Sequence, residues 1–452
     1  MNLDLLIRGA RVLVDGSWKA AGVGVLNGMV RTVDALDARP DAAEVVELAD
    51  DEVLIPGLVD THVHVNEPGR TEWEGFATAT RAAAAGGVTT VLDMPLNSIP
   101  PTVDVAALAA KRSAAAGQCA VDVGFWGGAV PANLGRLRAL HDAGVYGFKC
   151  FLLDSGVPEF PPLSGGQLEQ AMREVAAFDG LLIAHAEDGP TIAAAPHPTG
   201  RSYAGFLASR PPASENVAIN LVIEAARRTA ARVHVVHLSS AEAVPAIRAA
   251  RADGVRLTVE TCPHYLTLTA EQVPDGQTQF KCCPPIRAAA NRDLLWAALA
   301  DGVIDVVVSD HSPSTPALKQ FGTGDFGTAW GGISSLQLGL PLVWTEARSR
   351  GHELAEVVGW MSTGTADLVG ATGKGRIAVG GTADLVVFAP DAPFVVDPGR
   401  LHHRHPVTPY AGKTLTGVVR RTYLGGRLVP GPVPHGSLIE PQGGRPCPTS
   451  PT

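Results

Sequence analysis

The middle of the chain repeats a short apolar segment followed by an alanine-rich, helix-like segment. Buried strands of a parallel sheet are nearly continuous apolar runs, and the helices that connect them cover the faces of the sheet. Between residues 54 and 374 we expect eight such strands, at 57–64, 89–94, 121–126, 146–152, 181–185, 233–238, 256–261 and 304–309. Eight strand–helix units predict a (β/α)8 TIM barrel, an α/β fold, although a doubly wound sheet would show the same alternation.

Both ends of the chain have the pattern of β-structure. Residues 1–53 alternate apolar and polar side chains between turn-forming pairs, and the same pattern returns at 383–388 and 417–419. We therefore expect residues 1–53 and 375–430 to form one composite β-sandwich domain beside a barrel made by 54–374. Residues 431–452 are rich in proline, glycine, serine and threonine, and we expect a disordered tail there.

Composition and charge exclude several kinds of function. Of 452 residues, 46% are hydrophobic and 18% are charged, which is typical of a globular protein. The net charge of -9 is spread without a basic block, which argues against a nucleic acid or a membrane surface as partner. We find no apolar run of the roughly 18 residues that a membrane helix needs, no signal-peptide pattern and no disulfide-type cysteine spacing. We expect a soluble, cytoplasmic protein with reduced thiols.

Several metal-binding side chains stand at the carboxyl ends of the expected strands. His62 and His64 are two residues apart, so they share one face of a strand. His185, His237 and Asp310 end the fifth, sixth and eighth strands. Each has a structural explanation when taken singly, and a His-x-His pair in a strand is more often structural. Together they mark the barrel face where active sites form, and four histidines, a lysine and an aspartate suit two borderline divalent ions.

The lysine of this set, Lys149, lies in the otherwise apolar segment 146–152. An inward ammonium is costly to desolvate, so it must be paired, neutralised or modified. A carbamate formed with carbon dioxide would turn it into a carboxylate-like bridging ligand; the alternative is a lysine whose amine reaches the barrel rim. Asp60 is either an outer partner of an imidazole or the cap of a strand end. His234, three residues before His237, is expected to face outward against a helix.

These residues resemble the amidohydrolase superfamily, in its cyclic-amidase branch of dihydroorotases, hydantoinases (dihydropyrimidinases) and allantoinases. The resemblance covers nearly the whole chain. It implies that His62, His64 and Asp310 bind one metal and that His185 and His237 bind the other. It also implies that Lys149 is an N6-carboxylysine that bridges the two ions. Zinc is the expected metal, with cobalt and manganese as alternatives, and a homotetramer is the expected assembly.

Within this branch the flanking segments look most like those of allantoinases, at 56–75, 93–102, 147–151, 261–265, 283–287, 309–313 and 329–333. Dihydroorotases usually have an arginine two residues after the HxH pair and a histidine four residues after the aspartate. This chain has Asn66 and Ser314 at those positions, which removes groups suited to an anionic substrate. The argument separates allantoinases from hydantoinases less well, because both substrates are uncharged rings.

The resemblance implies hydrolysis of the hydantoin-ring amide of allantoin to allantoate, a step in purine degradation. The nucleophile would be a hydroxide shared by the two metals, and Asp310 would act as general acid and base. One alternative is a hydantoinase or dihydropyrimidinase acting on a related cyclic amide. Another is a non-catalytic scaffold relative, against which the complete ligand set argues.

Substrate contacts are expected from four residues, at Asn97, Asn66, Cys283 and Gly332, the last two through backbone groups. Asn97 could instead be a turn residue, and Asn66 could instead orient a loop. The segment 154–163 is rich in glycine and proline. It is either a mobile lid or a passive surface loop.

Overall fold

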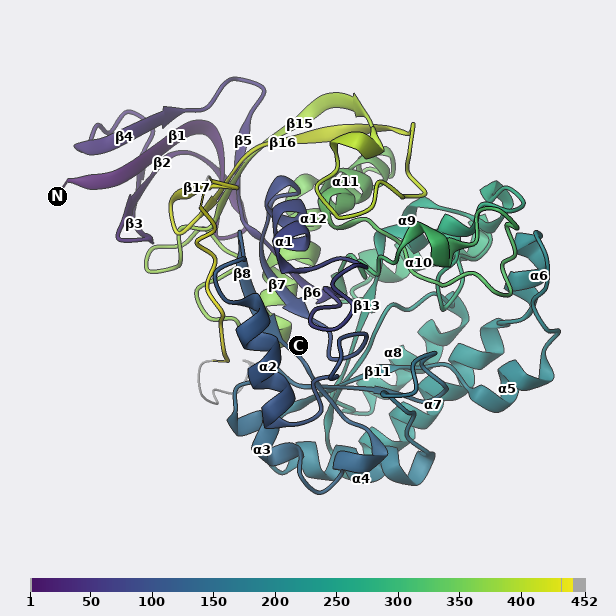
Figure 1. Cartoon of the computed structure of the whole chain (residues 1–452). Helices are drawn as coiled ribbons and strands as arrows, with labels where there is room; N and C mark the ends of the chain where they lie inside the picture. The colour runs from purple at the N-terminus through teal and green to yellow at the C-terminus, as the bar shows by residue number, and fades with distance from the viewer. Residues whose placement is uncertain (1, 432, 442–452) are drawn as a thin grey trace.

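A closed barrel of eight parallel strand positions forms the centre of the protein (Figure 1). The computed structural model describes residues 2–431 and 433–441. Neighbouring strands pair in parallel, and a parallel bridge between Val63 and His311 closes the ring. The strands are β6 (Leu58–Val63), β7 (Val88–Asp93), β8 (Asp122–Phe125) continued by β9 (Gly127–Gly128), β10 (Phe148–Phe151), β11 (Leu181–His185), β12 (Arg232–Val235), β13 (Leu257–Thr261) and β14 (Val306–Val307). The expected barrel is confirmed, and the doubly wound alternative is wrong.

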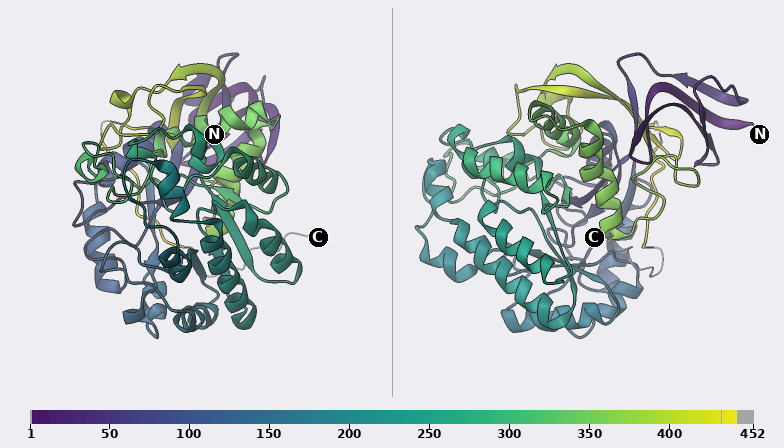
Figure 2. Two further views of the ribbon diagram at one scale, coloured as in Figure 1. Left: turned by 90° about the vertical axis from the view of Figure 1, so that its right-hand side faces the viewer. Right: turned by 180° about the vertical axis from the view of Figure 1, so that it is seen from behind.

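The helices that connect the strands lie around the outside of the barrel (Figure 2). α4 shows why they form: the Ser164 side chain accepts from the Gln167 N–H, the Gln167 side chain accepts from the Ser164 N–H, and apolar residues every three or four positions face inward. Within the described residues, none of the helices has the length and apolarity needed to span a bilayer. They are α1 (Phe76–Ala85), α2 (Val105–Ala115), α3 (Leu137–Asp142), α4 (Gly165–Ala176), α5 (Gly189–Ala194), α6 (Tyr203–Ala208), α7 (Pro212–Thr229), α8 (Val244–Ala252), α9 (Pro263–Thr267), α10 (Ala289–Ala300), α11 (Gly339–Ser349), α12 (Leu354–Val358) and α13 (Gly364–Val369).

The two ends of the chain form a single eight-stranded sheet beside the barrel, as the purple and yellow strands of Figure 1 show. Its order is β17-β16-β15-β5-β1-β2-β3, and β4 pairs with β1. The strands are β1 (Leu3–Val14), β2 (Ser17–Leu26), β3 (Met29–Ala35), β4 (Ala42–Glu47), β5 (Val53–Pro56), β15 (Leu385–Val395), β16 (Thr414–Leu424) and β17 (Arg427–Val429). The β-rich region built from both chain ends is thus present.

Strand β15 separates two hydrophobic cores. Because side chains alternate along a strand, Val386 and Phe388 pack into the core of the barrel. Leu385 and Val387 pack into the smaller core of the N-terminal strands. The sheet is therefore attached to the barrel by burial on one of its faces, and β5 leads directly into β6, the first barrel strand.

Part of the expected tail packs against the barrel. The Gly436 N–H donates to the Cys119 carbonyl oxygen, the Val123 N–H donates to the Ser437 oxygen, and the Ile439 N–H donates to the Val123 oxygen. The first half of β8 has an open edge because β10 pairs with β9, and this segment covers that edge. The expectation of disorder is wrong for residues 436–439. Residues 442–452 of the same expectation lie outside the described residues.

Candidate metal centre and substrate pocket

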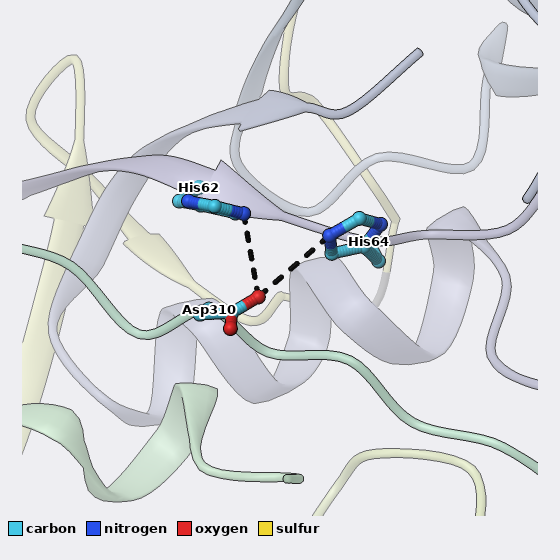
Figure 3. A group of neighbouring side chains, drawn as sticks. All are labelled: His62, His64 and Asp310. Atoms are coloured by element: carbon cyan, nitrogen blue, oxygen red, sulfur yellow. Dashed lines mark ion pairs between the residues drawn. The ribbon is translucent and has the colours of Figure 1, made fainter. Parts of the chain in front are cut away.

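Three of the predicted ligands meet where β6 and the segment after β14 lie side by side. Oδ1 of Asp310 is 3.3 Å from Nε2 of His62 and 3.7 Å from Nε2 of His64 (Figure 3). All three side chains are buried, and their donor atoms lie within 4.8 Å of one another. Two imidazoles and a carboxylate at this spacing can hold one divalent ion.

The remaining predicted ligands lie beside this group. Nζ of Lys149 is 3.1 Å from Nε2 of His62. The ring centroids of His185 and His237 are 4.6 Å apart, and those of His62 and His237 are 5.4 Å apart. Donor atoms of Cys262 and His264 also lie within 4.8 Å of Asp310 and form a second group that could hold a metal. We take the first group as the metal centre because Lys149, His185 and His237 adjoin it.

Burial keeps the histidines of this centre neutral. It lowers the pKa of His62, His64 and His237 well below the usual value, and the neighbouring Lys149 and other imidazoles lower it further. Burial also lowers the pKa of His185, against the raising effect of Glu187. Neutral imidazole is the form that binds a metal.

The Lys149 side chain does not reach the barrel rim. The residue is 1% exposed, and burial lowers the pKa of its amine to about 8, although Asp310 and Glu260 act in the opposite direction. Burial also raises the pKa of the Asp310 carboxyl to about 7, against the lowering effect of Lys149. The Ser312 hydroxyl donates to Oδ1 of Asp310 at 2.7 Å and fixes its orientation.

Glu260 on β13 is a central residue of the site that the sequence analysis does not identify. Its Oε1 accepts from Nδ1–H of His62 and from the backbone N–H of His237, and its Oε2 lies 2.9 Å from Nε2 of His234. Glu260 lies between Thr258 and Thr261 on its strand, so an acid there does not stand out in the sequence as Lys149 does in its apolar segment.

The expectation that His234 faces outward is wrong. His234 lies on the same side of β12 as Glu260, and its Nδ1 is 2.8 Å from the hydroxyl of Thr258. The expectation assumed that strand alternation continues from His234 to His237. However, β12 ends at Val235, and His237 has a φ of 41°, in the left-handed region. The alternation is therefore lost before His237, and both histidines face the interior.

Asp60 lies within β6 and binds backbone N–H groups rather than an imidazole, so neither expectation for it fits fully. Its Oδ1 accepts from the His62 backbone N–H at 3.1 Å, and its Oδ2 accepts from the Ser309 N–H at 3.1 Å. These hydrogen bonds join β6 to the segment that carries Asp310. Asp60 thereby holds together β6, which carries His62, and the segment after β14, which carries Asp310.

The metal centre forms the base of a pocket of about 320 Å³. That volume is at the lower end of the range for small-molecule sites. Five of the six predicted metal ligands line it; His62 lies behind them. Asn97, Cys283 and Gly332 line the same pocket. Nδ2 of Asn97 is 3.4 Å from Nδ1 of His64, so the side chain lies beside a predicted ligand. Asn97 also has a φ of 66°, which is typical of a turn residue. Both the expected substrate contact and the alternative of a turn residue therefore fit the structure.

Two expected substrate contacts are already engaged within the protein. The Gly332 N–H donates to the Lys281 carbonyl oxygen at 2.8 Å, and the Gly332 carbonyl oxygen accepts from the Lys319 ammonium, so both backbone groups of Gly332 have partners within the protein. Asn66 is not part of the pocket lining. Its Nδ2 donates to the Pro313 carbonyl oxygen at 3.3 Å, so its contacts fit the alternative of a loop-orienting residue.

Two buried lysines hold the loop 327–332, which lines the pocket. The Lys319 ammonium donates to the carbonyl oxygens of Trp330 at 3.1 Å and Gly332 at 2.5 Å. The Lys281 ammonium donates to Ala329 at 2.6 Å. Across residues 2–431 and 433–441, neither lysine forms an ion pair with a carboxylate. Backbone carbonyls therefore replace acidic side chains as the partners of both cations.

The segment 154–163 lies at the pocket mouth, where Asp154, Ser155 and Gly156 contribute to the lining. An ion pair of 2.5 Å between Glu159 and Arg70 ties it to the loop after β6, and Arg70 also donates to the Asn97 carbonyl oxygen at 2.9 Å. The segment is therefore linked to the substrate side of the pocket. Whether it opens during turnover stays a prediction.

Comparison with known proteins agrees with this geometry. The model of the amidohydrolase family matches residues 53–429, and the chain belongs to this family. It is therefore a metal-dependent hydrolase of cyclic amides.

Within the family, the chain groups with the allantoinases. It is 58% identical to an allantoinase of Streptomyces avermitilis over 442 residues, which cover 98% of each chain. It is 50% identical to the allantoinase of Saccharomyces cerevisiae over 382 residues, 83% of this chain and 82% of the relative. The allantoinase of Arabidopsis thaliana is 43% identical over 94% of this chain and 87% of its own.

Solved structures of hydantoinases have the same fold. The L-hydantoinase (dihydropyrimidinase) of Arthrobacter aurescens has a TM-score of 0.88 and 29% identity, covering 97% of this chain and 98% of its own. The dihydropyrimidinase of Brevibacillus agri has a TM-score of 0.88 and 28% identity, covering 98% of this chain and 99% of its own. The expected pairing of a TIM barrel with a β-sandwich is confirmed.

Proposed function

We propose that this protein hydrolyses the hydantoin-ring amide of allantoin to give allantoate. The observation that carries the proposal is the convergence of four neutral histidines, Lys149 and Asp310 at the base of one small pocket. Similarity to allantoinases over nearly the full chain selects the substrate within the class of cyclic amides. Purine degradation would supply that substrate.

We further propose that the pocket holds two divalent ions, zinc in the first place. His62, His64 and Asp310 would hold one ion, and His185 and His237 the other. The donor set fits these roles. Nδ1 of His237 is buried and has no hydrogen-bond partner within the described residues. Nε2 of His185 donates to Glu187, so Nδ1 of His185 keeps the lone pair that could bind a metal. When bound, the ions would lower the pKa of a water molecule and polarise the ring carbonyl.

Lys149 is proposed to bridge the two ions as a carbamate. The reaction joins the neutral amine to carbon dioxide through a new N–C bond and releases one proton, so it needs the unprotonated lysine. Burial lowers the pKa of Lys149 to about 8, which makes that form accessible near neutrality. Its position 3.1 Å from Nε2 of His62 would place the added carboxylate among the histidines.

Asp310 is proposed as the general base and then the general acid. Its carboxylate would take a proton from the attacking water and deliver it to the ring nitrogen that leaves. Ser312 holds Oδ1 of Asp310, and the carboxyl lies at the edge of the pocket, 8% exposed, where a ring can approach it. The orientation of the carboxylate is therefore set before substrate binds.

A hydantoinase is the second candidate function, favoured by the solved structures with the same fold. The test is hydrolysis of allantoin, hydantoin, dihydrouracil and dihydroorotate by protein reconstituted with zinc and bicarbonate. We expect ring opening of allantoin well above the other three. Turnover of hydantoin or dihydrouracil without allantoin would overturn the substrate assignment and leave the metal centre in place.

The assembly and the location of the protein are proposals of the same kind. We propose a homotetramer in the cytoplasm, in line with the family resemblance. Light scattering combined with size-exclusion chromatography would give the mass of the assembly, and a mass of one or two chains would overturn the tetramer.

A further inference from the structure

One carboxylate contacts a predicted ligand of each metal. Oε1 of Glu260 accepts from Nδ1–H of His62, a ligand of the first ion, and from the backbone N–H of His237, a ligand of the second, at 3.2 Å. The Glu260 side chain is 2% exposed, so water does not compete for it. A single oxygen atom is therefore placed to influence both halves of the centre.

The hydrogen bond to His62 fixes the tautomer of that imidazole. Because the Glu260 oxygen accepts, Nδ1 of His62 carries the hydrogen and Nε2 keeps its lone pair. Nε2 is the atom that points to Asp310, 3.3 Å away, and to Nζ of Lys149. The contact thus turns the binding nitrogen toward the position where a metal would lie.

The backbone contact acts on His237 in a different way. His237 has a φ of 41°, a conformation that a residue with a side chain adopts at an energetic cost and keeps only when its surroundings hold it. The hydrogen bond from its N–H to Glu260 is one such restraint. Without that bond, the turn that brings the His237 side chain to the pocket loses support.

Glu260 is itself held in place from the barrel interior. Its second oxygen, Oε2, accepts from Nε2–H of His234, and Nδ1 of His234 accepts from the Thr258 hydroxyl at 2.8 Å. The four side chains form a row from Thr258 through His234 and Glu260 to His62. All hydrogen-bonding atoms of the Glu260 carboxylate are therefore used on this row and on His237.

We propose that Glu260, supported by His234, is a positioning residue that sets the affinity of both metal subsites. The inference rests on the metal centre of the proposed function. Partners that orient a metal-binding histidine and raise its basicity change metal affinity about 10–100-fold when they are removed. In this chain, one carboxylate would exert that effect on two ions at once.

The test compares zinc affinity in the wild-type protein and in two variants, by competition with a chromophoric chelator. Glu260→Leu removes the acceptor, and we expect about 100-fold weaker binding of both ions. Glu260→Gln keeps an acceptor oxygen but loses the charge, and we expect a loss of about tenfold, a partial rescue. If Glu260→Leu does not fold, Glu260→Gln alone decides. Unchanged affinity for either ion in Glu260→Gln would overturn the inference.

Glu215→Gln is the matched control. Glu215 is an equally buried carboxylate that pairs with Arg287 and with the backbone N–H groups of Ser239 and Ser240, and it forms no hydrogen bond with a predicted ligand within the described residues. We expect its zinc affinity to equal that of the wild type. A similar loss in Glu215→Gln would show that any buried carboxylate matters, and would overturn the specific role of Glu260.

The spectrum of the cobalt-loaded protein gives a readout that a general loss of stability would not move. At full occupancy we expect the visible absorption bands of cobalt to shift in Glu260→Gln and to stay unchanged in Glu215→Gln. His234→Gln should weaken zinc binding, but should add little in the Glu260→Leu background, because His234 acts through Glu260. If the losses of zinc affinity in the two variants were additive, His234 would not act through Glu260, and the proposed row of hydrogen bonds would be contradicted.

These measurements separate this inference from the proposed function. A wild-type protein that binds two ions but does not open allantoin would contradict the substrate assignment and leave the role of Glu260 testable. A wild-type protein that binds no zinc or cobalt would overturn both.

Discussion

Nζ of Lys149 and Nε2 of His62 lie 3.1 Å apart in the interior of the barrel, and both residues are almost completely buried. Nε2 of His62 holds a lone pair and can accept a hydrogen bond from Nζ, while a positive charge on Lys149 lowers the pKa of the imidazole. A carbamate on Lys149 would replace this hydrogen bond with a metal bound between the two side chains.

The first prediction follows from this contact. Lys149→Ala should lose hydrolysis and most of its metal, because the bridging group is gone. It should also leave a cavity beside His62 that accepts a small carboxylate, so acetate or propionate should restore part of the activity. Activity and metal content are measured with increasing carboxylate concentration.

Lys149→Met is the control for this prediction. Methionine fills the cavity and offers no place for a carboxylate, so added acetate should have no effect. Rescue of both variants alike would contradict the bridging role. Intact mass spectrometry under native conditions should show the mass of one added carbon dioxide in the wild type and in neither variant.

The second prediction concerns Asp310. Asp310→Asn keeps the size of the side chain but cannot accept and return a proton, so the turnover number should fall about 10²–10⁴-fold. Metal content is measured alongside by atomic absorption. Ser312→Ala removes only the hydrogen bond to Oδ1 and should cost far less. Full activity in an Asp310→Asn protein that holds both metals would contradict the assignment.

The third prediction concerns the loop 327–332. Lys319→Met leaves the carbonyl oxygens of Trp330 and Gly332 without their donor and lets the pocket wall shift. We expect kcat/KM to fall by up to about 100-fold, mostly through KM, because the metal ligands are untouched. Steady-state kinetics measure this split. Lys19→Met, at an exposed position of β2, should behave as the wild type. A fall confined to kcat would contradict the role in substrate binding.

The fourth prediction uses the pKa of Lys319. Burial lowers that pKa from 10.5 to about 7, so between these values the unfolded chain binds a proton there that the folded protein does not. The contribution of Lys319 to stability therefore rises as the pH rises from about 7 to 10.5 and is lost as the pH falls through about 7.

Urea unfolding at about pH 7.5 and about pH 9.5 tests the sign. The free energy of unfolding of the wild type, relative to that of Lys319→Met, should be greater at the higher pH. An equal difference at both values would show that the ammonium persists in the fold. The neutral amine still has two N–H groups for the two carbonyls, so the loop should stay in place at alkaline pH.

The part of the site that lies on regular strands could be predicted from the sequence. His62, Lys149 and His185 are at strand positions, where alternation and the rule that barrel sites form at the carboxyl ends of strands place the side chains. The fold follows for the same reason, because the repeated unit of strand and helix dictates it. The prediction from the sequence fails where the backbone leaves the strand conformation.

His234 shows that failure. A left-handed residue at His237 breaks the alternation, and no local pattern announces it, since such a conformation is held by distant contacts like that with Glu260. The roles of Lys281 and Lys319 could not be predicted from the sequence for a related reason. Their partners are backbone carbonyls of a loop, which carry no signal in the identity of the side chains.

The shared sheet has a consequence for the order in which the molecule is made. β5 leads into β6, which carries His62, and one of the neighbours of β5 is β15, whose residues leave the ribosome more than 300 positions later. The barrel seam beside β6 also closes only when His311 arrives. During synthesis, β6 therefore remains unpaired on the side where His311 later binds. A ribosome-bound chain that stops before β15 should not retain zinc, and the metal centre should be one of the last parts of the protein to mature.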